Sequence, residues 1–341
     1  MDIGVLLVPQ PRRTAQLAQM VEGLGFASLA LVDSQNLAPE VWSHLMVAAG
    51  ATTRIRLTPG VSNSVTRDPA LSACAALTLH AESNGRAVLA LGRGDSSVQR
   101  IGRKLDPVAS FEHHLATLQA YLSGEAVDRD GFASRLEWLS HVKLPKVPVE
   151  VAATGPRVIE AAARRADRIC FAVGADLEHL GEALERARAA ARAAGRDPKA
   201  LRYGAFVNCV INQDVLVARD ALRGAVASFA RFSAMPGSRL ASLPAPLRRT
   251  AEYLRSHYDM REHTRVDAGH TDGVDDAFVD WFALAGPVER VLPRFVALAR
   301  LGLDFVHVIP ASTGVPRDVA AGSLMGLGQG LLPALRAALG S

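Results

Sequence analysis

The strongest constraint on the fold is a regular alternation of short apolar runs with longer amphipathic stretches along the whole chain. Eight such runs occur, and a stretch with helical spacing of its apolar residues follows each of them. The runs are continuously apolar, which is typical of parallel strands that are buried on both faces. They span residues 3–8, 28–32, 55–61, 87–91, 149–153, 168–173, 203–211 and 305–309.

Two architectures are built from such units, an open doubly wound sheet and a closed (β/α)8 barrel, the TIM barrel. Eight units favour the barrel, and 341 residues suffice for one barrel of roughly 250 residues with insertions. No G-x-G-x-x-G motif follows the first strand, where the sequence reads VPQPRR. A dinucleotide-binding Rossmann domain is therefore disfavoured. We expect an α/β fold, a (β/α)8 TIM barrel with insertions, as a single domain over residues 1–341.

Two segments interrupt the alternation. Residues 124–146 are polar and predict a short hairpin before the fifth strand. Residues 234–282 are longer than a connector in a compact domain needs, and they mix apolar with titratable side chains. We interpret this second insertion as a lid over the active site.

Charge and cysteine content limit the partners and the location. Lys and Arg (38) exceed Asp and Glu (34) by four without a block of five like charges, so we expect no nucleic-acid partner. No run reaches about 18 uninterrupted apolar residues, so we expect no membrane span. Cys74, Cys170 and Cys209 form no C-x-x-C pair and lie in apolar surroundings. These features favour free thiols in a reducing compartment, and we expect a cytoplasmic protein.

Polar and glycine-rich clusters follow four successive strands, at Asp33–Asn36, Gly60–Pro69, Gly92–Ser97 and Ala153–Arg157. In barrels the active site lies at the carboxyl ends of the strands, so these clusters should converge on one pocket. Its candidate catalytic residues are Asp33, Asn63 and Asp95. An acid at a strand end can orient a ring or position a water molecule, although Asp33 could also simply cap the next segment.

The fourth cluster is the best candidate for an anion site. Thr154 and Gly155 precede a helix whose first position is Pro156, and free N–H groups at a helix N-terminus favour a phosphate. The alternative is a plain helix start. Arg93, Arg100, Arg103 and Lys104 could anchor a polyanionic group or form a solvated face.

Four segments resemble the luciferase-like flavin-dependent oxidoreductases, most of all the branch with methylenetetrahydromethanopterin reductases and other enzymes of the deazaflavin coenzyme F420. They are GVSNSVTRDPALSACAALTLHAESNGR at 60–86, LALGRGDSS at 89–97, VAATGPRVIEAAARRADRI at 151–169 and FALAGPVERV at 282–291. The resemblance implies a barrel with F420 or FMN at its mouth, and a cis peptide between Gly60 and Val61 that supports the ring. The expected cofactor-binding residues are Gly60, Val61, Ser62, Asn63, Gly92, Gly94, Asp95, Ser96, Ala153, Thr154, Gly155, Pro156, Arg157, Val173 and Gly174.

The function that this resemblance implies is hydride transfer between coenzyme F420 and a small organic substrate. Two alternatives stay open. One is an FMN-dependent two-component monooxygenase, which would need a flavin reductase as partner, and the other is a non-catalytic flavin-binding homologue.

One departure from the family's pattern concerns proton donation to the substrate. Many members carry Asp-His after the second strand, where this chain has Asp33 and Ser34, so proton donation, if any, must come from elsewhere or from water. His257, His263 and His270 of the expected lid lack the spacing of a metal triad, and we expect no metal ion.

We also expect a homodimer. Members of the family commonly pair through outer helices, and the helix expected at 69–83 is apolar on nearly all sides.

Overall fold

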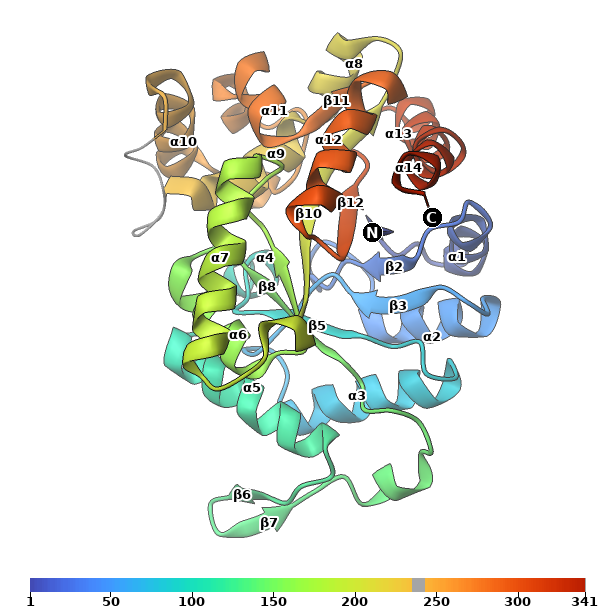
Figure 1. Ribbon diagram of the computed structural model, residues 1–341, viewed down its shortest axis with the longest axis vertical. Coiled ribbons are helices and arrows are strands. Elements are labelled where there is room, and N and C mark those ends of the chain that lie inside the picture. The colour runs from blue at the N-terminus through green and yellow to red at the C-terminus, as the bar shows by residue number, and fades with distance from the viewer. Residues whose placement is uncertain (235–242, 341) are drawn as a thin grey trace.

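In the computed structural model, which describes residues 1–234 and 243–340, the strands form the closed parallel barrel that the alternation predicts (Figure 1). All eight predicted strands are confirmed. The third is split into β3 and β4; β3 pairs with β2 and β4 pairs with β5, which closes the sheet. The strands are β1 (Asp2–Leu7), β2 (Ser28–Leu31), β3 (Arg56–Pro59), β4 (Ser62–Asn63), β5 (Leu89–Gly92), β8 (Val149–Ala153), β9 (Arg168–Phe171), β10 (Arg202–Ile211) and β12 (Phe305–Ile309).

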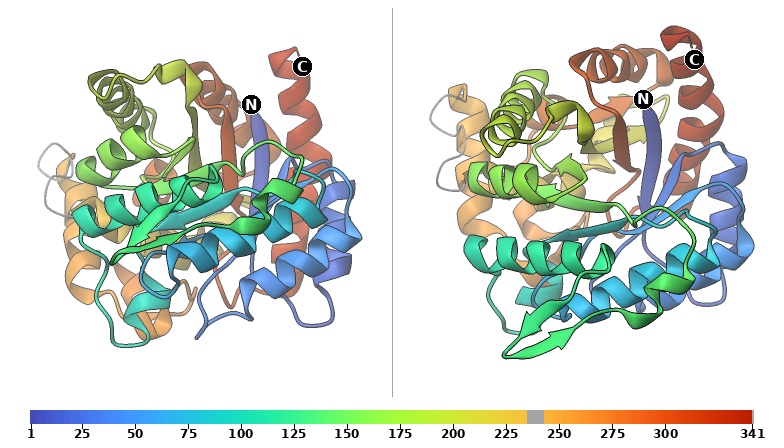
Figure 2. Two further views of the ribbon diagram at one scale, coloured as in Figure 1. Left: turned by 90° about the horizontal axis from the view of Figure 1, so that it is seen from below. Right: turned by 60° about the horizontal axis from the view of Figure 1, so that its bottom comes forward.

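Helices surround the strands, so both faces of the sheet are covered (Figure 2). This explains the continuously apolar runs, because every residue of β2, β5 and β9 is buried. The covering helices are α1 (Thr14–Gly23), α2 (Val41–Ala51), α3 (Pro69–Glu82), α5 (Val108–Leu122), α6 (Pro156–Arg165), α7 (Leu177–Ala193), α12 (Val288–Leu301), α13 (Arg317–Met325) and α14 (Leu332–Leu339).

The first insertion forms the predicted hairpin, in which β6 (Val127–Arg129) pairs antiparallel with β7 (Phe132–Ser134). It projects from the lower end of the molecule in Figure 1.

The second insertion is helical and has its own apolar core. Within 234–282, residues 235–242 lie outside the described part of the chain. The rest contains α10 (Ala245–His257) and α11 (Asp276–Phe282), followed by β11 (Leu284–Gly286), which pairs with β10. Side chains of α10 and α11, such as Leu254 and Phe278, pack with those of α8 (Val215–Asp220) and α9 (Arg223–Ala230) in one cluster. The single helical stretch expected after the seventh strand is thus mainly two helices, α8 and α9.

A charged cluster is buried inside the barrel. Arg168 Nε donates to Glu150 Oε2 at 2.8 Å, and His307 Nε2 lies 3.1 Å from Glu150 Oε1. Burial alone would raise the pKa of Glu150, but His307 and Arg168 outweigh it and lower this pKa to about 2. Cys170 completes a group whose ligand atoms lie within 4.8 Å of one another. Because Arg168 already neutralises Glu150, and burial raises the pKa of the Cys170 thiol, this geometry suits an ion pair better than a metal site.

No helix in the described ranges combines the length and the apolar character needed to cross a membrane. Cys74, Cys170 and Cys209 are free thiols, as the sequence predicts.

Candidate active site at the carboxyl end of the barrel

A cavity of about 660 Å³ opens where the strands end. Its walls come from the segments that follow β1, β2, β3, β5 and β8, together with the second insertion. The predicted residues that line it are Asp33, Gly60, Val61, Ser62, Gly92, Gly94, Asp95, Ser96, Thr154, Gly155, Pro156 and Arg157.

Four predicted residues do not face the cavity. Asn63 donates to Ser97 Oγ at 3.1 Å and accepts from the N–H groups of Val65 and Thr66 at 3.0 and 2.8 Å, so it shapes the loop after β4. Ala153 and Val173 belong to the apolar core.

Gly174, the fourth, has a positive φ of 85°, and a Cβ on it would lie 2.8 Å from the Phe282 ring. It therefore allows the turn after β9 to pack against α11.

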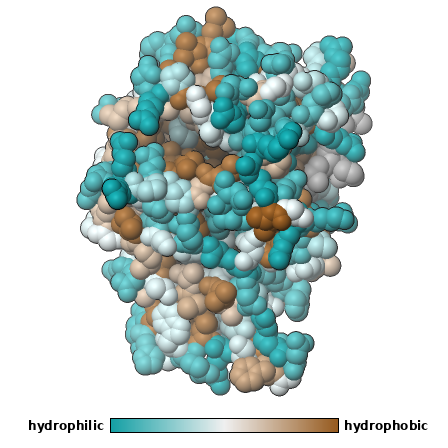
Figure 3. Space-filling model, turned by 180° about the vertical axis from the view of Figure 1, so that it is seen from behind, coloured by the Kyte–Doolittle hydropathy of each residue, from teal (hydrophilic) through white to brown (hydrophobic). Residues whose placement is uncertain are grey.

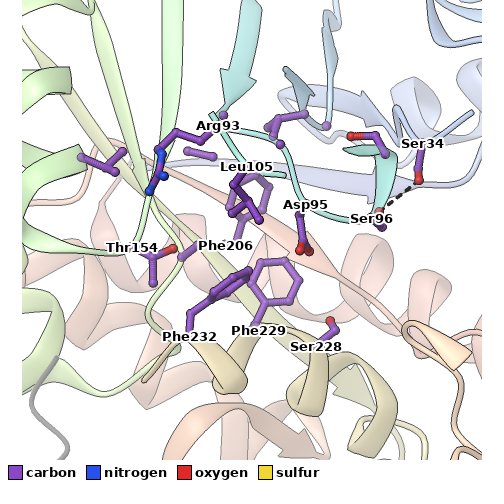
Figure 4. A pocket seen from close by; sticks show the side chains of 18 of the residues that line it. Ser34, Arg93, Asp95, Ser96, Leu105, Thr154, Phe206, Ser228, Phe229 and Phe232 are labelled. Carbon is purple, nitrogen blue, oxygen red and sulfur yellow. Dashed lines mark hydrogen bonds between the residues drawn. The ribbon is translucent and has the colours of Figure 1, made fainter. Parts of the chain in front are cut away.

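One part of the cavity is lined by apolar side chains. The peptide bond between Gly60 and Val61 is cis, as the resemblance implies. A Cβ on Gly60 would lie 2.2 Å from Leu6 Cδ1, so a larger residue there would require the Leu6 side chain to move. Phe206, Phe229 and Phe232 gather opposite Asp95, and Arg93 and Thr154 lie to one side of them (Figure 4).

Apolar side chains also reach the rim. Val8 and Leu37 line the cavity although they are 46% and 40% exposed. In Figure 3, the rear face of the molecule shows a hollow with hydrophobic side chains along its edge, within a mostly hydrophilic surface.

Asp33 is a buried carboxylic acid at the cavity. Its side chain is 8% exposed, and its Oδ2 atom is buried without a hydrogen-bond partner, 3.9 Å from Arg67 Nε. Burial raises the pKa of Asp33, although Ser62 and Arg67 favour the charged form. Ser34 bonds to Ser96, with 3.0 Å between the two Oγ atoms (Figure 4).

The other part of the cavity is basic. Arg93, Arg157 and Arg186 line it beside the N-terminus of α6, where the N-cap residue Gly155 offers no side-chain bond. Burial, with a contribution from Arg157, lowers the pKa of the Arg93 guanidinium, although Asp106 opposes this. Pro156 has no N–H group and the Val158 N–H donates to the Gly155 carbonyl oxygen at 3.0 Å, so the Arg157 N–H is the helix donor that, with these cations, suits an anion.

Arg100, Arg103 and Lys104 do not line the cavity, contrary to the idea of a cationic anchor there. Arg103 and Lys104 are exposed, and Arg100 Nη1 donates to the carbonyl oxygens of Met260 and Arg261 at 2.9 Å each. Arg100 thus fastens the insertion to the barrel.

The second insertion forms one wall of the cavity. The sequence predicts that this insertion covers the active site but not which of its side chains line the cavity. Arg261, His263, Thr264 and Arg265 line the cavity from this side, beside Thr313, which follows β12. The Thr264 and Thr313 hydroxyl oxygens lie 2.7 Å apart. Phe206, Phe229, Phe232 and Thr313 carry no local signal of a site, because their places depend on how distant segments pack.

Comparison with known proteins shows the family and the fold. The model of the luciferase-like monooxygenase family matches residues 3–304. A 5,10-methylenetetrahydromethanopterin reductase from Methanolobus tindarius is 30% identical over 232 residues, 67% of this chain and 71% of that protein. A phthiodiolone/phenolphthiodiolone dimycocerosates ketoreductase from Mycobacterium kansasii is 30% identical over 320 residues, 89% of this chain and 86% of that protein.

Among solved structures, the coenzyme F420-dependent tetrahydromethanopterin reductase from Methanopyrus kandleri superposes with a TM-score of 0.76 at 21% identity. The match covers 98% of this chain and 99% of that one.

Proposed function

Because this chain belongs to the luciferase-like monooxygenase family, we propose that it is an oxidoreductase that transfers hydride between coenzyme F420 and a small organic substrate. The observation that carries this proposal is that one cavity is lined both by apolar side chains, among them Phe206, Phe229 and Phe232, and by arginines beside the start of α6. A deazaflavin with a phosphate-bearing, acidic tail has the same two characters. When bound, the deazaflavin ring supplies or accepts the hydride.

The chain's own residues have separate tasks in this proposal. The Gly60–Val61 bulge and the walls formed by Gly92 and Gly94 bind the ring. Thr154 and Gly155 at the start of α6 bind the phosphate through backbone N–H groups. The apolar side chains of Phe206, Phe229 and Phe232 would help to exclude water from the reacting atoms once ring and substrate are bound.

Arg157 favours F420 over FMN. It lines the cavity at the start of α6, whereas Arg186, which also lines it, forms an ion pair with Glu160 at 3.0 Å. A cation at Arg157 suits a cofactor whose tail carries carboxylates beyond the phosphate. An FMN-dependent monooxygenase with a flavin reductase as partner is the second candidate, since the family description itself names monooxygenases.

The tail contacts can be tested by comparing F420 with its deazaflavin chromophore without phosphate and tail. The parent should bind F420 more tightly than the chromophore, and Arg157→Gln should narrow that difference about tenfold or more, as loss of a charged hydrogen bond does. Arg165→Gln, at the exposed end of the same helix, is the matched control. An unchanged preference in Arg157→Gln would place the tail elsewhere.

We also propose a lid, a homodimer and a cytoplasmic location. The lid is the insertion 234–282, whose segment from Arg261 to Arg265 walls the cavity. The dimer would form through α3, where Leu71 is 66% exposed. Because Ala76 of the same helix is fully buried in the monomer, a charge there would disturb the core and not the contact. The three free cysteines favour a reducing compartment.

A further inference from the structure

Two side chains of the second insertion form a hydrogen-bonded pair at the cavity. Tyr258 Oη lies 2.5 Å from His263 Nδ1, and the two rings meet edge to face at 77° with their centroids 5.9 Å apart. His263 lines the cavity, and Tyr258 lies behind it. Because Tyr258 occupies Nδ1, Nε2 is the ring nitrogen that remains for a molecule in the cavity.

The surroundings fix the protonation of this pair. Burial lowers the pKa of His263 to about 4; Asp95 opposes this shift, while Arg231, Arg100 and His270 add to it. The imidazole is therefore neutral at pH 7. Burial also raises the pKa of Tyr258, against the effect of Arg231, so the phenol keeps its proton. A neutral pair can be joined in either direction, and a relay requires the phenol to donate to Nδ1 so that Nε2 carries the hydrogen.

The pair is held in place from two sides. The Arg231 guanidinium lies 4.5 Å from the centroid of the Tyr258 ring and forms an ion pair with Asp95. On the other side, the Val266 N–H donates to the Thr313 carbonyl oxygen at 2.9 Å. The neighbouring segment is fastened by Arg100, as described above. A donor that is fixed in this way loses little entropy when it acts.

We propose that Tyr258 and His263 form a proton relay that serves the substrate atom made basic by hydride transfer. This inference rests on the proposed function and narrows its substrate class to carbonyl compounds and the corresponding alcohols. Ser34 is a poor alternative, since its hydroxyl group is bonded to Ser96 and is not acidic.

The step balances as follows for a ketone. If a bound reduced deazaflavin supplies the hydride, that hydride forms the new C–H bond at the carbonyl carbon, and the π electron pair of the C=O bond moves to oxygen. That oxygen takes the proton from His263 Nε2, while Nδ1 takes the phenol proton of Tyr258. The Arg231 guanidinium over the Tyr258 ring favours the resulting tyrosinate and so opposes the effect of burial, and the tyrosinate then regains a proton from solvent. Alcohol oxidation runs the same transfers in reverse.

The relay makes a kinetic prediction for two variants. His263→Gln should lower kcat about 100-fold or more with cyclohexanone or 2-butanone as the probe ketone, while F420 affinity stays within twofold. Tyr258→Phe should lower kcat by about tenfold or more, because no phenol is then present to protonate Nδ1 as Nε2 gives its proton to the substrate. His257→Gln and Tyr253→Phe change the same residue types in the same insertion but away from the cavity, and they should match the parent.

A second readout needs no turnover. In protein labelled with 15N-histidine, His263 should show the Nε2–H tautomer and remain neutral down to about pH 5, and Tyr258→Phe should mix its tautomers. An Nδ1–H tautomer in the parent, or protonation near the ordinary value of histidine, would overturn the relay. So would an unchanged kcat in His263→Gln. Failure of the parent to bind F420 would instead count against the proposed function, and the NMR spectra would still decide the state of the pair.

Discussion

Replacing Gly155 with aspartate should change stability and cofactor affinity in opposite directions. Gly155 is the N-cap of α6, with φ −88° and ψ 156°, a conformation that any residue adopts. A Cβ built on it has no heavy atom within 4 Å, so the new side chain meets no steric obstacle. Gly155 also lines the cavity, so the same side chain enters the proposed phosphate site.

The expected magnitudes follow from the cap and from the anion site. Aspartate caps a helix better than glycine by a few tenths of a kcal/mol, and its charge at the helix N-terminus adds about 0.3–1 kcal/mol. The free energy of unfolding should thus rise by about 0.5–1 kcal/mol. The aspartate, however, takes the N–H groups that would bind the phosphate, and these bonds are worth about 1.5–3 kcal/mol. Affinity should therefore fall about tenfold to 150-fold from this cause alone.

A matched variant separates charge from shape. Gly155→Asn also caps the helix but carries no charge, so it should lose only the N–H contribution. Gly155→Asp should bind at least another tenfold more weakly, because two unit charges about 4 Å apart repel by about 4 kcal/mol at an effective dielectric constant of 20. Gly50→Asp, at an open and exposed position of α2, controls for a general effect of added charge.

The assays are denaturant unfolding for stability and quenching of F420 fluorescence for affinity. If both variants unfold like the parent or later and bind F420 equally well, the phosphate does not lie at the start of α6. That result would refute the reasoning even if the enzyme used F420.

Three further predictions concern the barrel interior, the cavity acid and the outer helices. Glu150→Gln should lower the free energy of unfolding by about 3–5 kcal/mol in urea titrations, because it leaves Arg168, only 7% exposed, beside a neutral amide. Since the pKa of Glu150 is lowered to about 2 from an ordinary 4.5, the parent should lose this stabilisation only as the pH falls from about 4.5 toward 2, and the variant should lack that acid dependence. Asp33→Asn should raise the Tm at pH 8 but not at pH 4 in differential scanning calorimetry, because a raised pKa means that the folded state is destabilised once the pH exceeds the ordinary value of aspartate; an equal Tm change at both pH values would contradict this account. Leu71→Glu should convert a dimer to monomers in sedimentation velocity, and a parent that already sediments as a monomer would rule out the α3 contact.

The strands and most of the residues that line the cavity could be predicted, because both depend on local sequence. A parallel barrel strand is apolar throughout, so its signal is complete within five or six residues, and its carboxyl end marks the site. This rule correctly predicts that the cavity is lined by Asp33, Asp95 and the Thr154–Arg157 segment. Asn63 also lies at the carboxyl end of a strand, but its side chain does not line the cavity. Its amide oxygen accepts hydrogen bonds from the N–H groups of Val65 and Thr66, which keeps the side chain turned toward its own loop.

The contacts between side chains of the second insertion could not be predicted from the sequence. Tyr258 and His263 are five residues apart in a polar stretch, and nothing in that spacing shows that they touch. Their contact depends on Arg231 and Asp95, which come from distant segments, and on α10 and α11 packing into a separate apolar core. Long-range packing of this kind leaves no periodic pattern in the chain.

The most direct test of the account is a titration of the purified protein with F420 and, in parallel, with FMN. The basic part of the cavity predicts that F420 saturates one site per chain and that FMN binds at least tenfold more weakly. Tight binding of FMN together with no binding of F420 would contradict the assignment and favour the monooxygenase instead.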